Sequence, residues 1–397
     1  MPKTVLVLNS GSSSIKYQLV DPASGHNLAS GLVERIGEPM GHIHHRYSVK
    51  EVDLNEPIAN HEVGLRMVLD LFNEVGPPLE EAGIVAVGHR IVQGGRYFSG
   101  PAAVDERVER LIGELSALAP LHNPAALVGI KVAESLLPDI PQVAVFDTAF
   151  FQDLPDRAAL YALDRDVAER YSIRRYGAHG TSHQFVSKQV SEILGGRDLR
   201  QIVLHLGNGA SASAIIGDHA VDTSMGLTPL EGLVMGTRTG DIDPAVTFHL
   251  QRVAGMSFEE VDELMNRKSG LKGLAGDNDM RQVREIARSG DQSASKRARE
   301  ALDVYVNRIV KYIGAYTAEM GGVDVITFTA GIGENDIDLR YEVCKRLEPL
   351  GVLLDEEANR QRARHPITIS QRGSVCRVMV VPTNEELAIA TQAMTVV

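Results

Sequence analysis

Several features that mark secreted, membrane-spanning or nucleic-acid-binding proteins are scarce in this sequence. There are only two cysteines, Cys344 and Cys376, and no secretory hydrophobic segment follows Met1. Disulfide frameworks need more cysteines and an oxidising compartment, so we expect a cytoplasmic protein. No apolar run approaches the roughly 20 residues that a helix needs to cross a bilayer. Basic residues number 40 against 52 acidic ones, a formal net charge of −12, so we expect neither a nucleic-acid nor a membrane partner.

The composition is otherwise that of an ordinary globular protein. Hydrophobic residues make up 44% of the chain and charged residues 23%, which argues against intrinsic disorder. A chain of 397 residues is long enough for two or three domains of roughly 100 to 200 residues each, and we expect two. Because the net charge is negative, an anionic substrate would have to be bound by local arginines.

A strand, a polar turn and a second strand occur twice along the chain. The first copy spans residues 4–20 and the second spans residues 202–216. Aligning Gly11 with Gly209 gives an offset of 198 residues, about half of the chain. We interpret this as an internal duplication in which each half opens on a hairpin whose tip can hold a phosphate. Chance similarity of two hairpins is the alternative.

Helix-period and strand-like segments alternate along the rest of the chain. Apolar residues recur every three or four positions over residues 299–320, and Gly321 and Gly322 end this predicted helix before a strand at residues 323–328. The mixture predicts an α/β fold with some antiparallel hairpins. The remaining predicted helices are 63–72, 104–118 and 125–136, and the remaining predicted strands are 84–87, 143–146 and 375–381.

No long linker marks a domain boundary in the sequence. The division that best fits the repeat lies near Asp147, with the segment from about Asn384 returning to the first half as a closing helix. We therefore predict an N-terminal domain of residues 1–147 plus 384–397 and a C-terminal domain of residues 148–383.

Three polar or glycine-rich loops follow strands and present backbone N–H groups that can bind phosphate. They are residues 9–14 with Lys16 close behind, residues 205–209, and residues 330–335. The P-loop pattern is absent, and the third loop lacks the last glycine of a dinucleotide fingerprint. A turn without a ligand is the alternative for each of the first two loops taken alone. Three such loops in one chain favour a nucleotide site.

Charged side chains close to these loops suit an anionic substrate. Arg90 follows the strand at residues 84–87, and Arg238 lies in a loop of glycines and threonines. Arginine binds carboxylate or phosphate through two parallel hydrogen bonds, although a surface salt bridge is the alternative for each. Asp147 ends the strand at residues 143–146, where open α/β sheets place ligand groups, and a helix N-cap is its alternative.

Two histidines four residues apart, His179 and His183, do not form a convincing zinc site. The glutamate of a zinc-binding H-E-x-x-H helix is missing between them. We favour His179 as a hydrogen-bond donor to a phosphoryl group at a helix N-terminus.

Two tracts rich in basic side chains are expected to be exposed surface. The tract of His42, His44 and His45 predicts an exposed hairpin rather than a metal site. The basic run at residues 360–365 predicts a solvated helix face rather than a nucleic-acid contact.

These segments together closely resemble the acetate kinase family of the sugar kinase, Hsp70 and actin superfamily. Several independent motifs match in order over nearly the whole chain, which is much more specific than any one glycine-rich loop. The matching segments are residues 7–17, 88–90, 120–124, 146–150, 179–183, 205–209, 228–244, 331–335 and 383–387.

The resemblance implies both a fold and a reaction. The fold class would be α/β, with two duplicated actin-like (ribonuclease H-like) domains and an active cleft between them. The reaction would be reversible transfer of the ATP γ-phosphate to acetate, giving acetyl phosphate and ADP. Mg²⁺ would be the cofactor, with Mn²⁺ as a substitute. Such enzymes are typically homodimers.

The resemblance also assigns roles to individual residues. The catalytic residues would be Asp147, His179 and Arg238. Acetate would contact Arg90, with a pocket for its methyl group formed by Val92, Leu121 and Pro229. The metal would be bound by Asn9 and Glu385. ATP would contact Lys16, His205, Leu206, Gly207, Asn208, Gly209, Asp279, Met280, Arg281, Gly331, Ile332, Gly333, Glu334 and Asn335.

Elementary electrostatics supports these roles. Phosphoryl transfer to a carboxylate brings like charges together, and each pair of unit charges at 4 Å costs about 4 kcal/mol at an effective dielectric constant near 20. Two arginines, the metal and a donor at His179 can offset that cost. A carboxylic acid with a pKa of roughly 4 to 5 is already ionised at pH 7. We therefore expect Asp147 to orient an arginine or a hydrated Mg²⁺ rather than to remove a proton.

Two residues depart from the family pattern. Ala178 stands where an aromatic residue usually helps to line the methyl pocket, and Gln93 stands where a histidine is common. A smaller side chain enlarges the pocket, and one methylene is worth only about 1–3 kcal/mol of discrimination, so we expect propionate to be used. The alternatives are a kinase for propionate or another short-chain carboxylate and, from a different class, a non-kinase ATPase related to actin or Hsp70.

Overall fold

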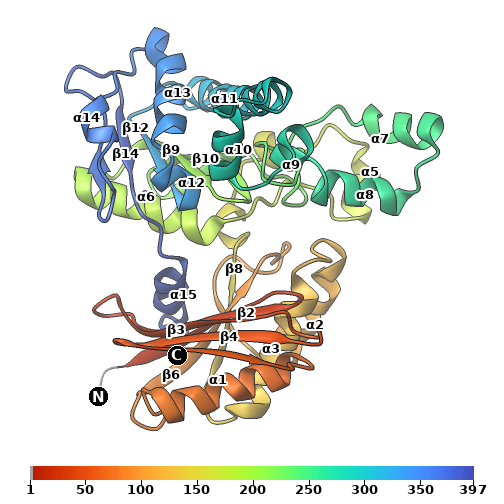
Figure 1. Cartoon of the computed structure of the whole chain (residues 1–397), viewed down its shortest axis with the longest axis vertical. Coiled ribbons are helices and arrows are strands. Elements are labelled where there is room, and N and C mark those ends of the chain that lie inside the picture. Colours follow the sequence, from red (N-terminus) through yellow and green to blue (C-terminus); the bar gives the residue numbers. More distant parts are fainter. Residues whose placement is uncertain (1–2) are drawn as a thin grey trace. The chain divides into compact units, whose positions relative to one another are not determined.

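The structure is a computed structural model that describes residues 3–397. It divides into two compact units. Unit 1 contains the described residues up to Gln152 together with Asn384–Val397, and unit 2 contains Asp153–Thr383. In Figure 1 unit 1 runs from red to yellow and includes the last, dark blue helix, and unit 2 runs from yellow-green to blue. Within residues 3–397 no helix is both long enough and apolar enough to cross a membrane.

Unit 1 is built on one eight-stranded sheet. Its strands are β1 (Thr4–Ser10), β2 (Ser14–Asp21), β3 (His26–Glu34), β4 (Gly41–Tyr47), β5 (Lys50–Glu56), β6 (Ile84–Ile91), β7 (Ala102–Ala103) and β8 (Gln142–Phe146). Their order across the sheet is β5-β4-β3-β2-β1-β6-β8-β7. The pairs from β5 to β1 are antiparallel, whereas β1, β6 and β8 run parallel.

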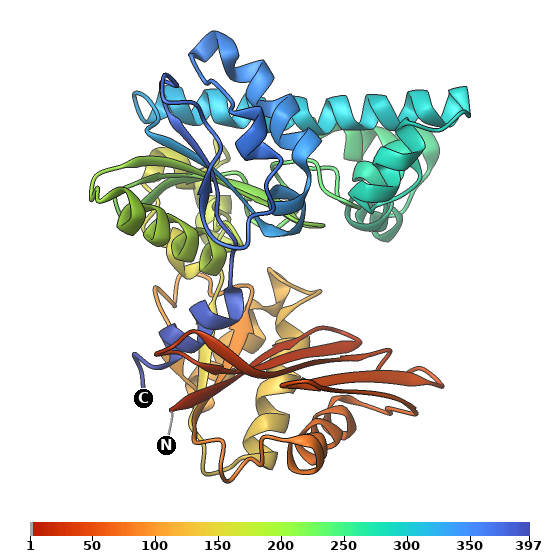
Figure 2. The same ribbon diagram turned by 60° about the vertical axis from the view of Figure 1, so that its left-hand side comes forward.

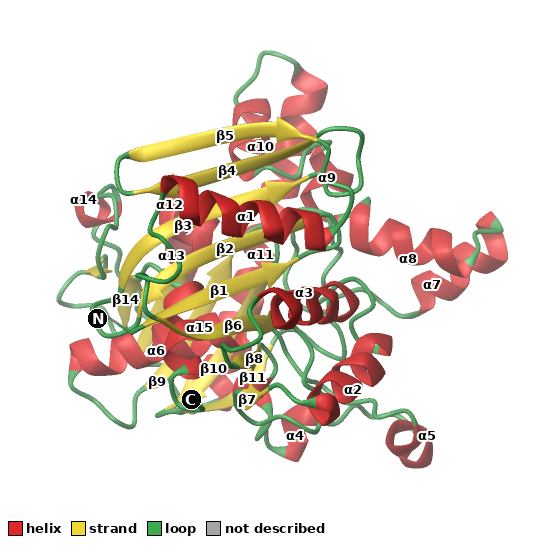
Figure 3. Cartoon of the chain, turned by 90° about the horizontal axis from the view of Figure 1, so that it is seen from below, coloured by secondary structure: helices red, strands yellow, loops and turns green. Residues whose placement is uncertain are grey.

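Both faces of this sheet are covered at β1. Leu6 and Leu8 pack in a cluster with α1 (His61–Val75) and α3 (Asn123–Leu136), which lie across one face of the sheet in Figure 3. Val5 and Val7 pack in a second cluster with α15 (Glu385–Ala393). Because successive side chains of a strand face opposite sides, two covered faces require an unbroken apolar strand. The other helical segments of unit 1 are α2 (Glu106–Glu114), η1 (Leu115–Ala117) and η2 (Ala149–Phe151).

Unit 2 is built on a six-stranded sheet in the order β11-β10-β9-β12-β14-β13, with strands β9 (Arg200–Leu206), β10 (Ala210–Ile216), β11 (His219–Thr223), β12 (Val325–Thr329), β13 (Ile367–Thr368) and β14 (Arg377–Val380). Its core centres on α11 (Gln292–Glu319), the long helix in Figure 2, which buries Tyr305, Ile309 and Ile313 with the strands. The other helical segments are α4 (Asp156–Ala159), α5 (Arg165–Arg170), α6 (Gly180–Leu194), α7 (Ala245–His249), η3 (Leu250–Ala254), α8 (Phe258–Arg267), α9 (Gly270–Ala275), α10 (Met280–Ala287), α12 (Ala330–Asn335), α13 (Ile337–Leu347), η4 (Glu348–Leu350) and α14 (Glu356–Asn359).

The two sheets share one strand order. The five strands β3-β2-β1-β6-β8 of unit 1 correspond in order and direction to β11-β10-β9-β12-β14 of unit 2. A short antiparallel strand follows at the edge of each sheet. This confirms the internal duplication. By the ends of the strands, the residue equivalent to Gly11, the first after β1, is Gly207, the first after β9, rather than Gly209.

The helix predicted over residues 299–320 begins earlier in the structure. The carboxylate of Asp291 accepts hydrogen bonds from the backbone N–H groups of Ser293 and Ala294 and so caps the first turn of α11. The first turns of this helix are mostly polar, so the apolar periodicity could not mark its start.

Two predictions about exposed tracts were wrong. His45 is fully buried on β4 and its Nδ1 lies 2.7 Å from the Tyr17 hydroxyl, whereas His42 and His44 contact Asp53 on the other face. Alternate residues of a strand face opposite sides, so one tract cannot be exposed throughout. Residues 360–365 are turns and loop after α14 rather than a helix face.

Candidate active site

An arginine and two acidic side chains meet at the ends of strands in unit 1. Arg90, near the end of β6, donates Nε–H and Nη2–H to Oδ2 of Asp147 at 3.1 and 2.8 Å. Asp147 follows β8 and is 1% exposed. Arg90 Nη1 lies 3.6 Å from Oε2 of Glu385, the first residue of α15. The parallel strands β6 and β8 therefore bring residues 57 positions apart into one ion pair.

The surroundings of Arg90 favour its charged form. Burial acts to lower the pKa of the guanidinium, but the charges of Asp147 and Glu385 outweigh burial and raise the pKa above its ordinary value. Asp147 holds the guanidinium from one side through its Oδ2. It is not the N-cap residue of the helical segment that follows, because η2 begins at Ala149 and Thr148 precedes it.

The first hairpin tip and the start of α15 are also in unit 1. Lys16 on β2 forms an ion pair with Glu386, next to Glu385, and its side chain is 52% exposed. Asn9 lies opposite Lys16 in the antiparallel pairing of β1 and β2. The carbonyl of Gly11 at the tip is contacted by Nε2 of His61 at 2.7 Å. Asn9, Lys16 and Glu385 therefore belong to unit 1.

One asparagine holds the turn next to two residues expected to line the methyl pocket. Asn123, the first residue of α3, accepts from the backbone N–H of Gln93 at 3.1 Å and donates to the Gln93 carbonyl at 2.9 Å. Val92 and Leu121 are near neighbours of Gln93 and Asn123 in the sequence and belong to the same unit. The Gln93 side chain turns back to the backbone N–H of Gly95 at 2.9 Å, so its role here is to hold the turn.

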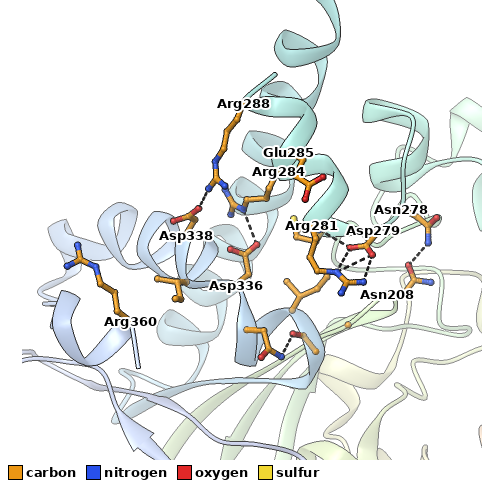
Figure 4. Close-up of a pocket in the computed structure, with 16 residues that line it drawn as sticks. Asn208, Asn278, Asp279, Arg281, Arg284, Glu285, Arg288, Asp336, Asp338 and Arg360 are labelled. Carbon is orange, nitrogen blue, oxygen red and sulfur yellow. Dashed lines mark hydrogen bonds and ion pairs between the residues drawn. The ribbon is translucent and has the colours of Figure 1, made fainter. Parts of the chain in front are cut away.

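The nucleotide loops predicted in the second half of the chain meet at one pocket in unit 2 (Figure 4). The pocket has a volume of about 1180 Å³, which is ample for a nucleoside triphosphate. Gly207 and Asn208 come from the hairpin tip between β9 and β10. The remaining predicted residues that line it are Asp279, Met280, Arg281, Gly331, Ile332 and Asn335.

Some predicted nucleotide residues do not line this pocket. Glu334 turns its carboxylate back to the backbone N–H groups of Ala330 and Thr383, at 2.9 and 3.1 Å, and so holds the loop. The carbonyl of Gly333 accepts from the buried Arg340 at 2.9 Å. Outside the lining are Lys16, His205, Leu206, Gly209, Gly333 and Glu334.

The pocket also holds charged residues that were not expected from the sequence. Arg284 of α10 donates to Asp336 at 3.0 Å and to both carboxylate oxygens of Glu342 at 2.9 and 3.1 Å. Arg284 in α10 and Arg288 at its C-cap follow the predicted Arg281 at intervals of three and four residues. That spacing is the sequence signal that could have found them. The other unexpected lining residues are Asn278, Glu285, Asp336, Ile337, Asp338 and Arg360.

Two histidine rings stack next to the hairpin tip of unit 2. His179, immediately before α6, has a left-handed backbone with φ of 59°, which is unusual for a residue with a side chain. Its ring stacks on His205 with centroids 4.3 Å apart. Nδ1 of His179 lies 2.9 Å from Oγ of Ser211. A side chain at Gly209 would place its Cβ 3.4 Å from His179 Nε2, so the ring packs closely on this tip.

Arg238 approaches the same glycine. Its Nη1 would lie 3.7 Å from a Cβ at Gly209 and donates to the carbonyl of Pro229 at 3.1 Å and to the sulfur of Met235 at 3.8 Å. Within residues 3–397 no carboxylate pairs with this guanidinium, and burial lowers its pKa. Arg238 is therefore a largely desolvated cation beside the hairpin tip that was predicted to bind phosphate.

The other two residues predicted around the substrate methyl are in unit 2. Pro229 is held by Arg238 through its carbonyl. Ala178 is 2% exposed and packs in the hydrophobic core of the unit with Met225 and Leu233.

The residues expected to bind metal supply oxygen donors. Asn9 offers an amide oxygen and Glu385 a carboxylate, and both belong to unit 1. Within residues 3–397 no group of three or more histidine, cysteine, aspartate or glutamate side chains forms a complete metal cage. That donor set fits Mg²⁺, which usually takes one or two carboxylates and completes its shell with water and substrate phosphates.

Fold and pocket together define a class of protein. A duplicated α/β fold, a nucleotide-sized pocket lined by strand-end loops, and a desolvated arginine beside one of those loops are the features of a nucleotide-dependent phosphotransferase. Sequence comparison makes the class specific. The sequence profile of the acetokinase family matches residues 4–391, and the chain belongs to this family.

Curated relatives match over almost their whole length. An acetate kinase of Leifsonia xyli subsp. xyli is 55% identical over 392 residues, which cover 98% of each chain. An acetate kinase of Streptomyces coelicolor is 53% identical, covering 99% of this chain and 97% of the relative. The family membership expected from the motifs is thereby confirmed.

Solved structures of related kinases also match this chain over almost its whole length. A propionate kinase from Francisella tularensis is 38% identical with a TM-score of 0.94 and 100% coverage of both chains. An acetate kinase from Porphyromonas gingivalis is 42% identical with a TM-score of 0.93 and 99% coverage of both chains. The predicted fold class, α/β with duplicated actin-like domains, is confirmed.

Proposed function

We propose that this chain is an acetate kinase that transfers the γ-phosphoryl group of ATP reversibly to acetate, giving acetyl phosphate and ADP. The observation that carries the proposal is the position of one hairpin tip in unit 2. Gly207 and Asn208 of this tip line the nucleotide pocket, while Gly209 lies against His179 and Arg238. The end of the pocket where the phosphates belong is thus the end that carries a buried cation and a ring donor.

In the reaction a carboxylate oxygen of acetate forms a bond to the γ-phosphorus. The bond from that phosphorus to the bridging oxygen breaks, and ADP leaves with the electron pair. Negative charge meets negative charge in this step, so stabilisation by fixed positive groups supplies most of the catalysis. Arg238 and the His179 ring are already fixed beside Gly209 and need no rearrangement to act.

Unit 1 supplies the groups for the acceptor. Arg90 binds the acetate carboxylate, and Asp147 orients Arg90 through the two hydrogen bonds to its Oδ2. Acetic acid is ionised at neutral pH, so no general base is needed to prepare it. Asp147 is therefore a positioning residue in this scheme. Within unit 1, Val92 and Leu121 would contact the methyl group.

Asn9 and Glu385 would hold Mg²⁺ through their oxygen donors, and Mn²⁺ has the same donor preference. When bound, the ion neutralises charge on the phosphate oxygens. Glu385 also faces Arg90 at 3.6 Å, so its carboxylate is shared between the acceptor site and the metal. Lys16 contacts ATP and is kept close to Glu385 by its ion pair with Glu386.

Propionate is the second candidate substrate. The observation that favours it is that a solved relative 38% identical to this chain is named a propionate kinase. The small side chain of Ala178 does not carry the argument, because it is buried in the core of unit 2. A pocket for one additional methylene discriminates by only about 1–3 kcal/mol. We therefore expect turnover of acetate first and of propionate second.

Hydroxylamine trapping of acyl phosphate tests the function directly. Purified protein is incubated with ATP, Mg²⁺ and equal concentrations of acetate, propionate or butyrate, with reactions lacking ATP as controls. An ATP-dependent hydroxamate signal ranked acetate, propionate, butyrate is the expected result. A strict acetate preference would contradict propionate use. ATP binding with no hydroxamate from any acid would instead leave an actin-like or Hsp70-like ATPase.

We also propose that the protein is a cytoplasmic homodimer of two-domain chains. Both cysteines are buried and unpaired, as in a reducing compartment. Phe248, Val253 and Phe258, on the segment from α7 to α8, expose 54, 71 and 70% of their surface, which is unusual for large apolar side chains unless a second copy covers them. Sedimentation analysis should give twice the chain mass of 43.0 kDa, and a single-chain mass would refute the dimer.

A further inference from the structure

Four side chains of unit 2 form a continuous hydrogen-bonded chain that ends at His179. Oγ of Ser213 lies 2.7 Å from Nδ1 of His183, and Nε2 of His183 lies 2.7 Å from Oγ of Ser211. The same Ser211 oxygen lies 2.9 Å from Nδ1 of His179. Ser211, Ser213 and His183 are fully buried, so this chain is built into the unit between β10 and α6.

The Ser211 hydroxyl couples the two histidines because it has only one hydrogen to donate. Burial lowers the pKa of His183 well below its ordinary value, and the charge of His205 adds to this, so the His183 ring is neutral and carries one N–H. If that hydrogen is on Nε2, it is donated to Ser211, and Ser211 donates onward to His179 Nδ1. If it is on Nδ1, Ser211 donates back to His183, and His179 must place a hydrogen on its own Nδ1.

The two arrangements differ at Ser213. In the first, the Ser213 hydroxyl donates to Nδ1 of His183, and every member of the chain has a partner. In the second, the Ser213 oxygen accepts from His183, and no acceptor for its own hydrogen is present within the described residues. An unmatched buried hydroxyl hydrogen carries a free-energy cost, so the first arrangement is favoured.

The geometry around His179 agrees with a hydrogen on Nε2 of its ring. That atom faces the hairpin tip at Gly209, and Arg238 Nη1 approaches the same glycine. The stacked His205 has its Nδ1 occupied by Ser182 at 2.8 Å. Nε2 of His179 is therefore the ring nitrogen that faces the hairpin tip, and Nδ1 is the one that contacts Ser211.

We propose that Ser211 and His183 are positioning residues that fix the tautomer of His179, so that its Nε2 carries the hydrogen donated to the transferring phosphoryl group. The proposal deepens the proposed function and rests on it, because the donor role of His179 belongs to phosphoryl transfer. The serine chain is what allows a neutral histidine to act as a donor without taking up a proton from solvent.

The ring nitrogens report the tautomer without any need for catalysis. Nitrogen-15 NMR of histidine-labelled protein, with the His179 signals assigned from the H179N variant, should show a neutral ring with hydrogen on Nε2. A ring with hydrogen on Nδ1 in the unaltered protein would overturn the proposal even if the enzyme is active.

The S211A variant adds a kinetic readout. We expect kcat to fall about 10-fold or more, since positioned proton donors contribute roughly 10²- to 10⁴-fold, while the KM for ATP changes less than about 2-fold. The S211T variant keeps the hydroxyl and should recover most of kcat. The matched control is S295A, which removes another buried serine hydroxyl, one that donates to the Ala287 carbonyl at 2.6 Å far from the histidines in the hydrogen-bond network.

The outcomes separate this inference from the function itself. Unchanged kcat in S211A, or equal losses in S211A and S295A, would overturn the positioning role while acyl phosphate formation stands. If the unaltered protein forms no acyl phosphate, the proposed function fails, and the NMR measurement still decides whether the serine chain sets the His179 tautomer.

Discussion

Arg90 in unit 1 and Arg238 in unit 2 are both poorly exposed arginines. They differ in whether a carboxylate balances the charge of the guanidinium. In unit 1 Arg90 donates twice to Asp147 and faces Glu385, so its charge is more than balanced. In unit 2 Arg238 contacts only a carbonyl and a sulfur. The pKa of Arg90 is accordingly raised by its carboxylates despite burial, and that of Arg238 is lowered by burial.

Arg90 is therefore held in one orientation by a carboxylate, whereas Arg238 has no carboxylate partner within the described residues. A buried ion pair fixes the direction of the guanidinium and limits how strongly it attracts a further anion. A buried cation without a carboxylate is destabilising until an anion arrives, and it then interacts strongly. In the proposed reaction, Arg90 would bind the acceptor carboxylate as an arginine that is already oriented, and Arg238 would bind the phosphoryl group as an arginine without a carboxylate partner among the described residues.

Replacing Arg238 by methionine is expected to have the largest effect. Because the transferring phosphoryl group would lose its uncompensated cation, kcat should fall about 10³-fold or more. The free energy of unfolding should stay the same or rise, since the lost group is a desolvated charge without a carboxylate partner. Inorganic phosphate should raise the melting temperature of the unaltered protein but not of R238M. A variant that keeps activity, or that unfolds readily, would contradict the contrast with Arg90.

The D147N variant tests the other half of the comparison. Asparagine keeps the size of the side chain but removes the charge that orients Arg90, so the KM for acetate should rise about 10-fold and the free energy of unfolding should fall by roughly 3 kcal/mol. Substrate titrations and chemical denaturation measure the two effects, and R238M serves as the control that loses activity without losing stability. Loss of kcat with unchanged acetate KM and unchanged Mg²⁺ dependence would argue against an orienting role.

The sequence pointed to Arg90, Asp147 and Arg238 as candidate site residues, but it did not predict that Arg90 pairs with Asp147. The β-branched runs before Arg90 and Asp147 predicted two buried strands, and the glycine-rich loops at 205–209 and 330–335 predicted a phosphate site. A salt bridge was one alternative for Arg90, and an N-cap was one for Asp147. That each is the other's partner depends on the parallel register of β6 and β8, which local patterns do not specify.

Other features could not be predicted from the sequence for similar physical reasons. Within the described residues no carboxylate pairs with Arg238, and this depends on the surrounding tertiary structure. No local sequence motif could have predicted it. The burial of His45 and the ion pairs of Arg284 with Asp336 and Glu342 depend on which face each element presents. The family resemblance supplied roles for individual residues, but only packing shows that Glu334 turns back to hold its own loop.

Arg175 is a second poorly exposed arginine of unit 2 and, unlike Arg238, it is paired with carboxylates. It donates to Glu231 at 2.8 Å and lies 3.8 Å from Asp222. Burial raises the pKa of Asp222 to about 7, although the charge of Arg175 acts in the opposite direction. The folded protein therefore binds a proton at Asp222 that the unfolded chain has already released above about pH 4.

The smallest expected effect is a pH dependence of stability removed by D222N. A raised carboxyl pKa contributes stability that is fully present below the unfolded pKa and is lost as pH rises through the folded pKa. The unaltered protein should therefore lose more than about 1 kcal/mol relative to D222N between pH 4 and pH 7, since each pKa unit corresponds to about 1.4 kcal/mol. Denaturant titrations across this range measure the difference, which cancels the titration of other groups. If the stability difference does not change with pH, Arg175 balances the charge of Asp222 as fully as Asp147 balances the charge of Arg90. Arg238 would then be the exception within its own unit.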